Sequence, residues 1–202
     1  MNVGSFGLAI PEGRERTDGY VVMQHAQQYR IQVANHTNLQ CDAVVSIDGD
    51  KIGEYRLLAG QVWAIEHPSD SQQRFTFYAS GTTEAAAVGE AVVSQKEKGL
   101  VQVTFYPEQE FEMPHTLGGE SFGATRGGIT RGATKGLGIH GLGAGVSGLS
   151  GHSSAQYGKA NRIIRDEDAA VTITLRLVTD NTPKPLSMRK QRMANVVPPA
   201  VA

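Results

Sequence analysis

The chain has 202 residues, a formal net charge of −1 and a single cysteine, Cys41. Near-neutrality gives no global electrostatic attraction to nucleic acid or to an acidic membrane surface. No run of about 18 apolar residues is present that could span a bilayer. One cysteine cannot form an internal disulfide, so we expect a reducing compartment and a buried thiol. Residues 1–10 lack the basic start and long apolar centre of a secretion signal, which favours the cytoplasm.

Glycine is distributed very unevenly along the chain. Of the 24 glycines, 14 fall in residues 117–158, whereas residues 20–112 hold only six. Ordering a glycine costs more backbone entropy than ordering any other residue. The pattern therefore predicts a glycine-poor body that carries a glycine-rich insertion over residues 113–158, tethered at both ends by strands of the body.

The N-terminal part of the chain changes character near residue 20. Residues 1–19 contain several glycines, a proline and a charged run, which predicts an extended N-terminal arm. Apolar residues then alternate with others at 29–34, the period of two expected for a strand with one buried face. Further strand-like runs, bounded by turn residues, occupy 41–47, 51–58, 62–66, 74–78 and 100–106. Asp48-Gly49 predicts a hairpin, because both central residues of a type I′ turn need positive φ.

Residues 82–98 are the one helix candidate. Glu84 falls in the first turn, Lys98 in the last, and Gly99 just beyond the end. Gly89 inside this stretch weakens the helix by about 1 kcal/mol relative to alanine. We therefore expect one short helix.

A clean final strand is predicted at 170–178, where apolar and polar residues alternate. Residues 180–202 carry four prolines and several basic residues, which predicts an extended C-terminal arm. The body is therefore expected over 20–112 and 159–179. Short strands at spacings of about ten residues predict a mainly β fold, an antiparallel β-sandwich or jelly-roll-like body.

The sequence offers little for catalysis or cofactors. Residues 136–141 and 143–148 match the glycine spacing of a dinucleotide-binding loop, but neither follows a strand-like run or opens a helix. The histidines are not at the spacings of paired metal ligands. The Gly-x-Ser-x-Gly nucleophile elbow is absent. We expect no cofactor, no metal and no catalytic residue; Ser150 and Ser153 stay as the hydrolase alternative, which a serine-reactive probe would detect.

The glycine-rich insertion suggests assembly instead. Its apolar residues are too few for a core, but they would anchor an extended segment in grooves on a neighbouring subunit. Its basic residues could follow phosphates, yet Phe122 and Tyr157 give too little aromatic surface for a nucleic-acid platform. The residues expected to contact a partner are Phe122, Arg126, Ile129, Arg131, Leu137, Ile139, Leu142, Val146 and Leu149.

Several runs resemble small β-sandwich accessory proteins of virus particles. They are Tyr-Arg-Ile-Gln-Val-Ala-Asn at 29–35, Cys-Asp at 41–42, Ser-Ile-Asp-Gly at 46–49, Gly53, Arg-Phe-Thr-Phe at 74–77, and the strand-like runs at 99–105 and 174–178. The resemblance implies a capsid decoration (cement) protein that binds the major capsid protein or other virion proteins. It also implies a homo-oligomer, often a trimer in such proteins, on a virion assembled in the host cytoplasm. It supplies no catalytic residues and does not extend to the insertion.

A second function stays open, that of a carbohydrate-binding sandwich module. Such a module would use an exposed aromatic side chain, and Trp63, Tyr55 and Tyr78 are the candidates. Trp63 has Ile65 two positions on, which favours a side chain that packs inward. The exposure of these aromatic residues therefore separates the two functions.

Overall fold

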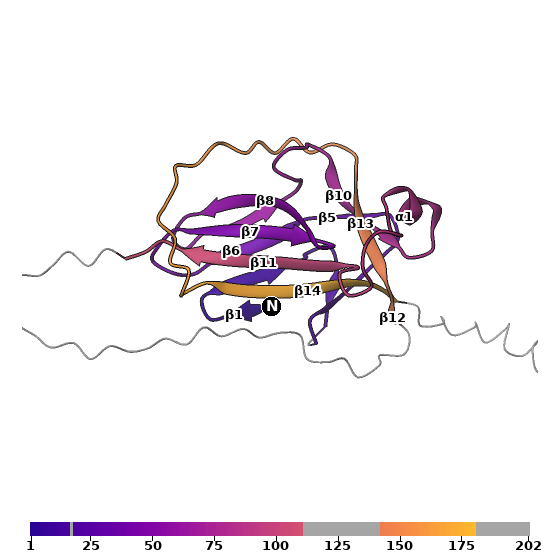
Figure 1. The fold of residues 1–202 in the computed structure, drawn as a ribbon, viewed down its shortest axis with the longest axis horizontal. Helices are drawn as coiled ribbons and strands as arrows, with labels where there is room; N and C mark the ends of the chain where they lie inside the picture. Colours follow the sequence, from indigo (N-terminus) through magenta and orange to yellow (C-terminus); the bar gives the residue numbers. More distant parts are fainter. Residues whose placement is uncertain (17, 111–141, 181–202) are drawn as a thin grey trace, which may run out of the picture.

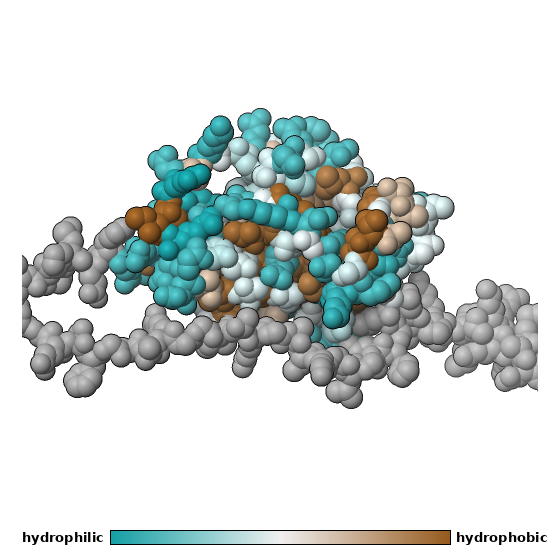
Figure 2. Space-filling view, viewed as in Figure 1, coloured by the Kyte–Doolittle hydropathy of each residue, from teal (hydrophilic) through white to brown (hydrophobic). Residues whose placement is uncertain are grey.

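The computed structural model describes residues 1–16, 18–110 and 142–180, and in these ranges most of the ordered elements are β-strands (Figure 1). Two layers of strands face each other around one continuous apolar cluster. Phe6 from one layer stacks on Phe105 from the other, with ring centroids 4.8 Å apart. Hydrophilic side chains cover much of the face seen in Figure 2, with small hydrophobic patches between them. The expected mainly β, sandwich-like body is confirmed.

The first layer is a seven-stranded sheet. Its strands, in spatial order, are β3 (Arg14–Glu15), β4 (Tyr20–Met23), β14 (Val171–Asp180), β11 (Leu100–Pro107), β7 (Cys41–Ile47) and β8 (Asp50–Leu57), and β12 (Leu142–Gly143) pairs with the end of β14. Neighbours run antiparallel except β4 and β14, which are parallel, so the sheet is mixed at this pair. The strand β8 forms one edge of the sheet.

The second layer consists of two smaller sheets. One contains β1 (Asn2–Val3), β2 (Phe6–Ala9), β6 (Ile31–Asn35) and β9 (Val62–Ile65), and the other contains β13 (Gly145–Ser150), β10 (Arg74–Ala79) and β5 (Gln27–Tyr29). The strand expected at 29–34 is thus divided at Arg30 between the two sheets. The Glu12 carboxylate stabilises the break, since it accepts hydrogen bonds from the Arg30 backbone N–H at 3.0 Å and from its Nε at 2.6 Å.

The N-terminal residues are part of the body. The strand β2 pairs with β6, and Phe6, Leu8 and Ile10 are buried. The expected N-terminal arm over residues 1–19 is therefore wrong for this part of the chain. The three apolar residues alternate with a period of two, as in a half-buried strand. The neighbouring glycines and Pro11 favour an irregular segment and made this pattern hard to recognise.

The end of the glycine-rich segment is also part of the body. Each residue of β13 pairs with one of β10. A Cβ at Gly145 would overlap the Phe77 ring, so glycine is needed for this close approach. The expected insertion over 113–158 is therefore wrong for residues 142–150, while residues 113–141 lie outside the described ranges. Of the expected C-terminal arm over 180–202, only Asp180 is described, and it ends β14.

The helix is shorter than the sequence predicts. The helix α1 covers only Thr83–Ala87, and its N-cap Thr82 accepts a hydrogen bond from the Ala85 N–H at 3.2 Å. Gly89 has a φ of +91°, a left-handed conformation that ends the helix. The other local predictions hold: Asp48 and Gly49 have φ of +53° and +92°, as the hairpin requires, and Cys41 is fully buried.

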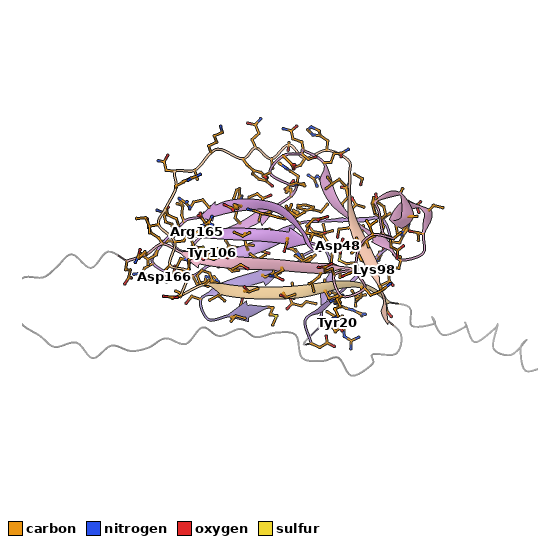
Figure 3. All side chains as sticks on the ribbon, in the orientation of Figure 1. Tyr20, Asp48, Lys98, Tyr106, Arg165 and Asp166 are labelled. Atoms are coloured by element: carbon orange, nitrogen blue, oxygen red, sulfur yellow. The ribbon has the colours of Figure 1, made fainter. Side chains whose placement is uncertain are left out.

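Asp48 joins three parts of the chain at one end of the sheet (Figure 3). Its Oδ1 accepts a hydrogen bond from the Gly99 N–H, and its Oδ2 accepts one from the Ser147 N–H, both at 2.6 Å. The Ser147 hydroxyl in turn lies 2.7 Å from the buried Tyr29 hydroxyl. Burial raises the pKa of Asp48 to about 6, although both backbone hydrogen bonds lower it.

The raised pKa predicts how stability depends on pH. The folded-state pKa of about 6 exceeds the ordinary value of 3.8, so the folded chain binds this proton more tightly than the unfolded chain. This tighter proton binding adds about 3 kcal/mol to the free energy of unfolding. The added stability is fully present below about pH 4 and is lost as the pH rises through about 6. Denaturant unfolding of the wild type and Asp48→Asn across this range checks it, with Asp168→Asn as the exposed control. Parallel pH profiles for wild type and Asp48→Asn would contradict the assignment.

Candidate functional site

An extended segment crosses above the edge strand β8. Residues 151–165, here called the arch, connect β13 to β14 and run over β8 at the top of Figure 1. Apart from one β-bridge of Arg165, the arch has no strand or helix of its own. Its position brings residues far apart in the sequence to one place.

The first half of the arch is fixed to the sandwich by hydrogen bonds. The Ser153 N–H donates to the Gln72 carbonyl at 2.8 Å, and the Ser153 hydroxyl donates to Glu66 Oε2 at 2.7 Å. The Tyr157 hydroxyl accepts a hydrogen bond from the Glu66 backbone N–H at 2.8 Å. Burial raises the pKa of Tyr157. This near anchor holds the arch against the second layer.

Aromatic side chains reinforce the near anchor. The buried His67 ring stacks on Tyr157 with centroids 4.2 Å apart, and its ring nitrogens lie 2.7 Å and 3.0 Å from the carbonyl oxygens of Pro68 and Ala155. Tyr55, Trp63 and Tyr157 meet edge to face in all three pairs, with centroids between 5.4 and 6.1 Å apart. The buried His67 thus helps to hold the arch against the sandwich.

Ion pairs fix the far end of the arch. Arg165 donates to Asp42 Oδ2 at 2.8 Å and to Glu54 Oε2 at 2.7 Å, while Arg56 donates to Asp42 Oδ1 at 2.7 Å. The Arg165 guanidinium also lies over the Tyr106 ring, 5.1 Å from its centroid. Hydrogen bonds from Lys51 and Arg165 lower the pKa of Glu54. Asp42 is buried, so its two cationic partners are needed to compensate its charge.

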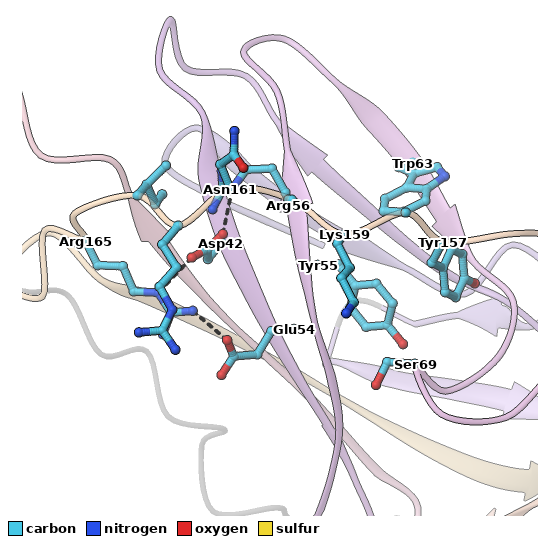
Figure 4. Close-up of a pocket in the computed structure, with 14 residues that line it drawn as sticks. Asp42, Glu54, Tyr55, Arg56, Trp63, Ser69, Tyr157, Lys159, Asn161 and Arg165 are labelled. Atoms are coloured by element: carbon cyan, nitrogen blue, oxygen red, sulfur yellow. Dashed lines mark hydrogen bonds and ion pairs between the residues drawn. The ribbon is translucent and has the colours of Figure 1, made fainter.

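The middle of the arch is free of such bonds. Residues 158–163 make no hydrogen bond or ion pair with any other residue that the structure describes. Beneath them lies a hollow of about 870 Å³. Its wall includes aromatic side chains at one end and the Asp42 ion pairs at the other (Figure 4). This volume lies within the range of about 300 to 1,000 Å³ that is usual for ligand sites.

The structure describes only three of the expected partner-binding residues. Val146 is buried in β13, so it belongs to the core and cannot contact a partner as expected. Leu149 is exposed on β13, and Leu142 lies in β12. The remaining six, Phe122, Arg126, Ile129, Arg131, Leu137 and Ile139, lie outside the described ranges.

The aromatic candidates for a carbohydrate site are mostly covered. Tyr55 is buried, and Trp63 is half-buried and packs against the core, as its pattern indicated. Tyr78 is half-buried on β10. Tyr55 and Trp63 both line the hollow, but Tyr78 does not.

Across residues 1–16, 18–110 and 142–180, no cluster of three His, Cys, Asp or Glu residues could hold a metal ion. Among the described helices, none is long and apolar enough to cross a membrane. Ser150 and Ser153 have other hydroxyl or carboxylate partners, Thr76 and Glu66.

Comparisons of the chain with protein-family models, with curated proteins and with solved structures gave no match. The candidate site is therefore defined by its own geometry.

The far anchor gives a direct prediction. In Asp42→Asn, an amide nitrogen replaces one acceptor oxygen and the charge that holds Arg56 and Arg165 is lost. We expect the free energy of unfolding to fall by about 2 to 3 kcal/mol. Glu54→Gln, at an exposed position with one of the same partners, should cost less than about 1 kcal/mol. Equal losses in the two variants, measured by denaturant unfolding, would show that Asp42 does not hold the arch.

Proposed function

We propose that this chain is a non-enzymatic structural protein that binds other protein subunits through its sandwich body and its extended segments. The arch is the observation that carries the proposal. It is fixed at Ser153 and Tyr157 and again at Arg165, while the backbone groups of residues 158–163 between the anchors are not bonded to any residue in the described ranges. Such backbone groups can bond to a partner. Because both ends of the arch are already fixed, the arch loses less conformational entropy on binding than a free segment would.

The biological setting proposed is a virion surface. The resemblance to small accessory proteins of virus particles supports a decoration (cement) role, with the major capsid protein or other virion proteins as partners. The sandwich would supply placement on the shell, and the extended segments would reach neighbouring subunits. A shell offers three-fold positions to a symmetric partner, so we propose self-association, with a trimer as the simplest form.

Solution mass and co-sedimentation test this proposal together. Light scattering after size-exclusion chromatography should give about three times the mass of one chain. The purified chain should also co-sediment with particles isolated from its source. A monomer at every concentration tested, combined with no co-sedimentation, would overturn the proposal. A monomer that does co-sediment would retain the binding role and remove only self-association.

A carbohydrate-binding module is the second candidate, because Trp63 lines the hollow beside Tyr55 and Tyr157. Trp63 is the only tryptophan, so its fluorescence reports on this hollow alone. If the module is correct, cello-, xylo- or manno-oligosaccharides should shift its emission in a saturable way. An emission spectrum that none of these sugars changes would exclude binding beside Trp63.

A further inference from the structure

The outer edge of β8 carries unpaired backbone groups. Gln40 directly precedes β7 and Glu108 directly follows β11, and the Glu108 N–H donates to the Gln40 carbonyl at 2.9 Å. In the register of this pair, the even-numbered residues of β7 therefore bond to β11. Bonding direction alternates along a strand, so the odd-numbered residues of β7 bond to β8. Glu54 and Arg56 lie opposite even-numbered residues of β7. Their backbone N–H and C=O groups therefore point away from β7, and no residue of the described chain bonds to them there.

This edge borders the hollow. Glu54, Tyr55 and Arg56 all line it, and residues 158–163 of the arch line its other side. The carbonyl of Ile52, just before this stretch, is already bonded to the Ser69 N–H at 3.3 Å, and Leu58 just after it is bonded to Gln61. Between these two points, the outward backbone groups of Glu54 and Arg56 have no bond to any described residue. They suit an extended segment of about five residues, at about 3.3 Å per residue.

The walls of the hollow specify the side chains that would fit. Side chains of an added strand would point alternately to the two faces of the sheet. On the inner side they would meet the aromatic cluster of Tyr55, Trp63 and Tyr157, which suits apolar groups.

The charges of the hollow favour an acidic segment. The carboxylates of Asp42 and Glu54 are already paired with Arg56 and Arg165. Lys159 and Arg162 line the same hollow, are exposed, and form no ion pair with the rest of the described chain. Two cations without partners at its rim would attract acidic side chains on the outer side of the segment.

We propose that the edge of β8 binds an extended segment of a neighbouring protein subunit, about five residues long, in which apolar and acidic side chains alternate. The segment adds to the seven-stranded sheet beneath the arch. The identity of the partner as a subunit rests on the proposed function, whereas the strand addition stands on the geometry of β8 alone.

Synthetic peptides test the strand addition on the full-length chain. The probes are acetylated, amidated hexapeptides in which aspartate alternates with valine, leucine, phenylalanine or tyrosine. At least one should bind saturably, with hydrogen exchange of the Glu54 and Arg56 amides slowed about tenfold or more. Lysine in place of aspartate should weaken binding about tenfold. Methylation of alternate backbone nitrogens of the best peptide should abolish it, because the ladder hydrogen bonds are lost.

A matched pair of variants isolates the backbone of β8. Glu54→Ala removes the carboxylate but keeps the N–H, whereas Glu54→Pro removes both. The outward N–H makes no bond to β7, so an edge strand tolerates the proline. We expect Glu54→Pro to bind the best peptide at least about tenfold more weakly than Glu54→Ala. Circular dichroism and thermal unfolding show whether both variants are folded, and the methylated peptide tests the same bonds without altering the protein.

The charge preference has its own variants. Lys159→Glu with Arg162→Glu should reverse the preference between aspartate and lysine peptides, and the exposed Lys96→Glu, outside the hollow, should not.

Three outcomes would overturn the strand addition: no binding by any hexapeptide up to about 1 mM, equal binding of the methylated peptide, or slow exchange of both amides in the chain alone. Slow exchange in the chain alone would mean that this chain or a second copy fills the edge. Failure of co-sedimentation with peptide binding intact would remove the virion role and leave the strand addition. Co-sedimentation without binding of any peptide would overturn the strand addition and place the virion contact on another part of the chain.

Discussion

The Asp42 carboxylate holds two guanidinium groups at once, and the position of the arch depends on this arrangement. Arg56 comes from the edge strand β8 and Arg165 from the arch, so a single buried acid connects the sheet edge to the segment that crosses it. Glu54 and the Tyr106 ring add further contacts to Arg165. A buried acid with two cationic partners is strongly coupled to both, because losing either leaves charge uncompensated.

The hollow follows from the positions of the two anchors. The Tyr157 anchor bonds to Glu66, just after β9 of the second layer, whereas the Arg165 anchor bonds to β7 and β8 of the first layer. The chain between them contains Gly158, at which even a Cβ would meet open space. Because residues 158–163 span the gap without bonds to the sheet, the edge of β8 stays accessible beneath them. The site is thus a consequence of where the arch is fixed.

Local signals in the sequence predicted much of the fold. The alternation at 41–47, 100–106 and 170–178 and the Asp48-Gly49 turn gave the central strands and their hairpin, because those residues satisfy the strand period and the turn conformation by themselves. The same reasoning missed β13, where glycine is needed to pack against Phe77, a residue about 70 positions away. Such a requirement is tertiary and leaves no period in the sequence.

The candidate site was beyond sequence reasoning for a related reason. Asp42, Arg56 and Arg165 form a network only after β7, β8 and the arch come together, and no spacing rule connects residue 42 with residue 165. In the sequence, Tyr157 is one aromatic residue at the end of a glycine-rich tract. Its role depends on contacts with Glu66 and His67, which lie 91 and 90 positions away in the sequence. Co-variation between distant positions among related sequences is the kind of signal that could have indicated these contacts.

The open edge of β8 carries a risk, since an unpaired strand edge invites uncontrolled association. Natural sheets limit that risk with charged side chains, bulges or a covering segment. Here β8 has all three: charges at Lys51, Glu54 and Arg56, an irregularity in its pairing with β7, and the arch above it. The arch differs from a simple cover because a hollow separates it from the strand. It therefore restricts approach from outside while leaving room for one extended chain, and that combination favours selective strand addition over open-ended aggregation.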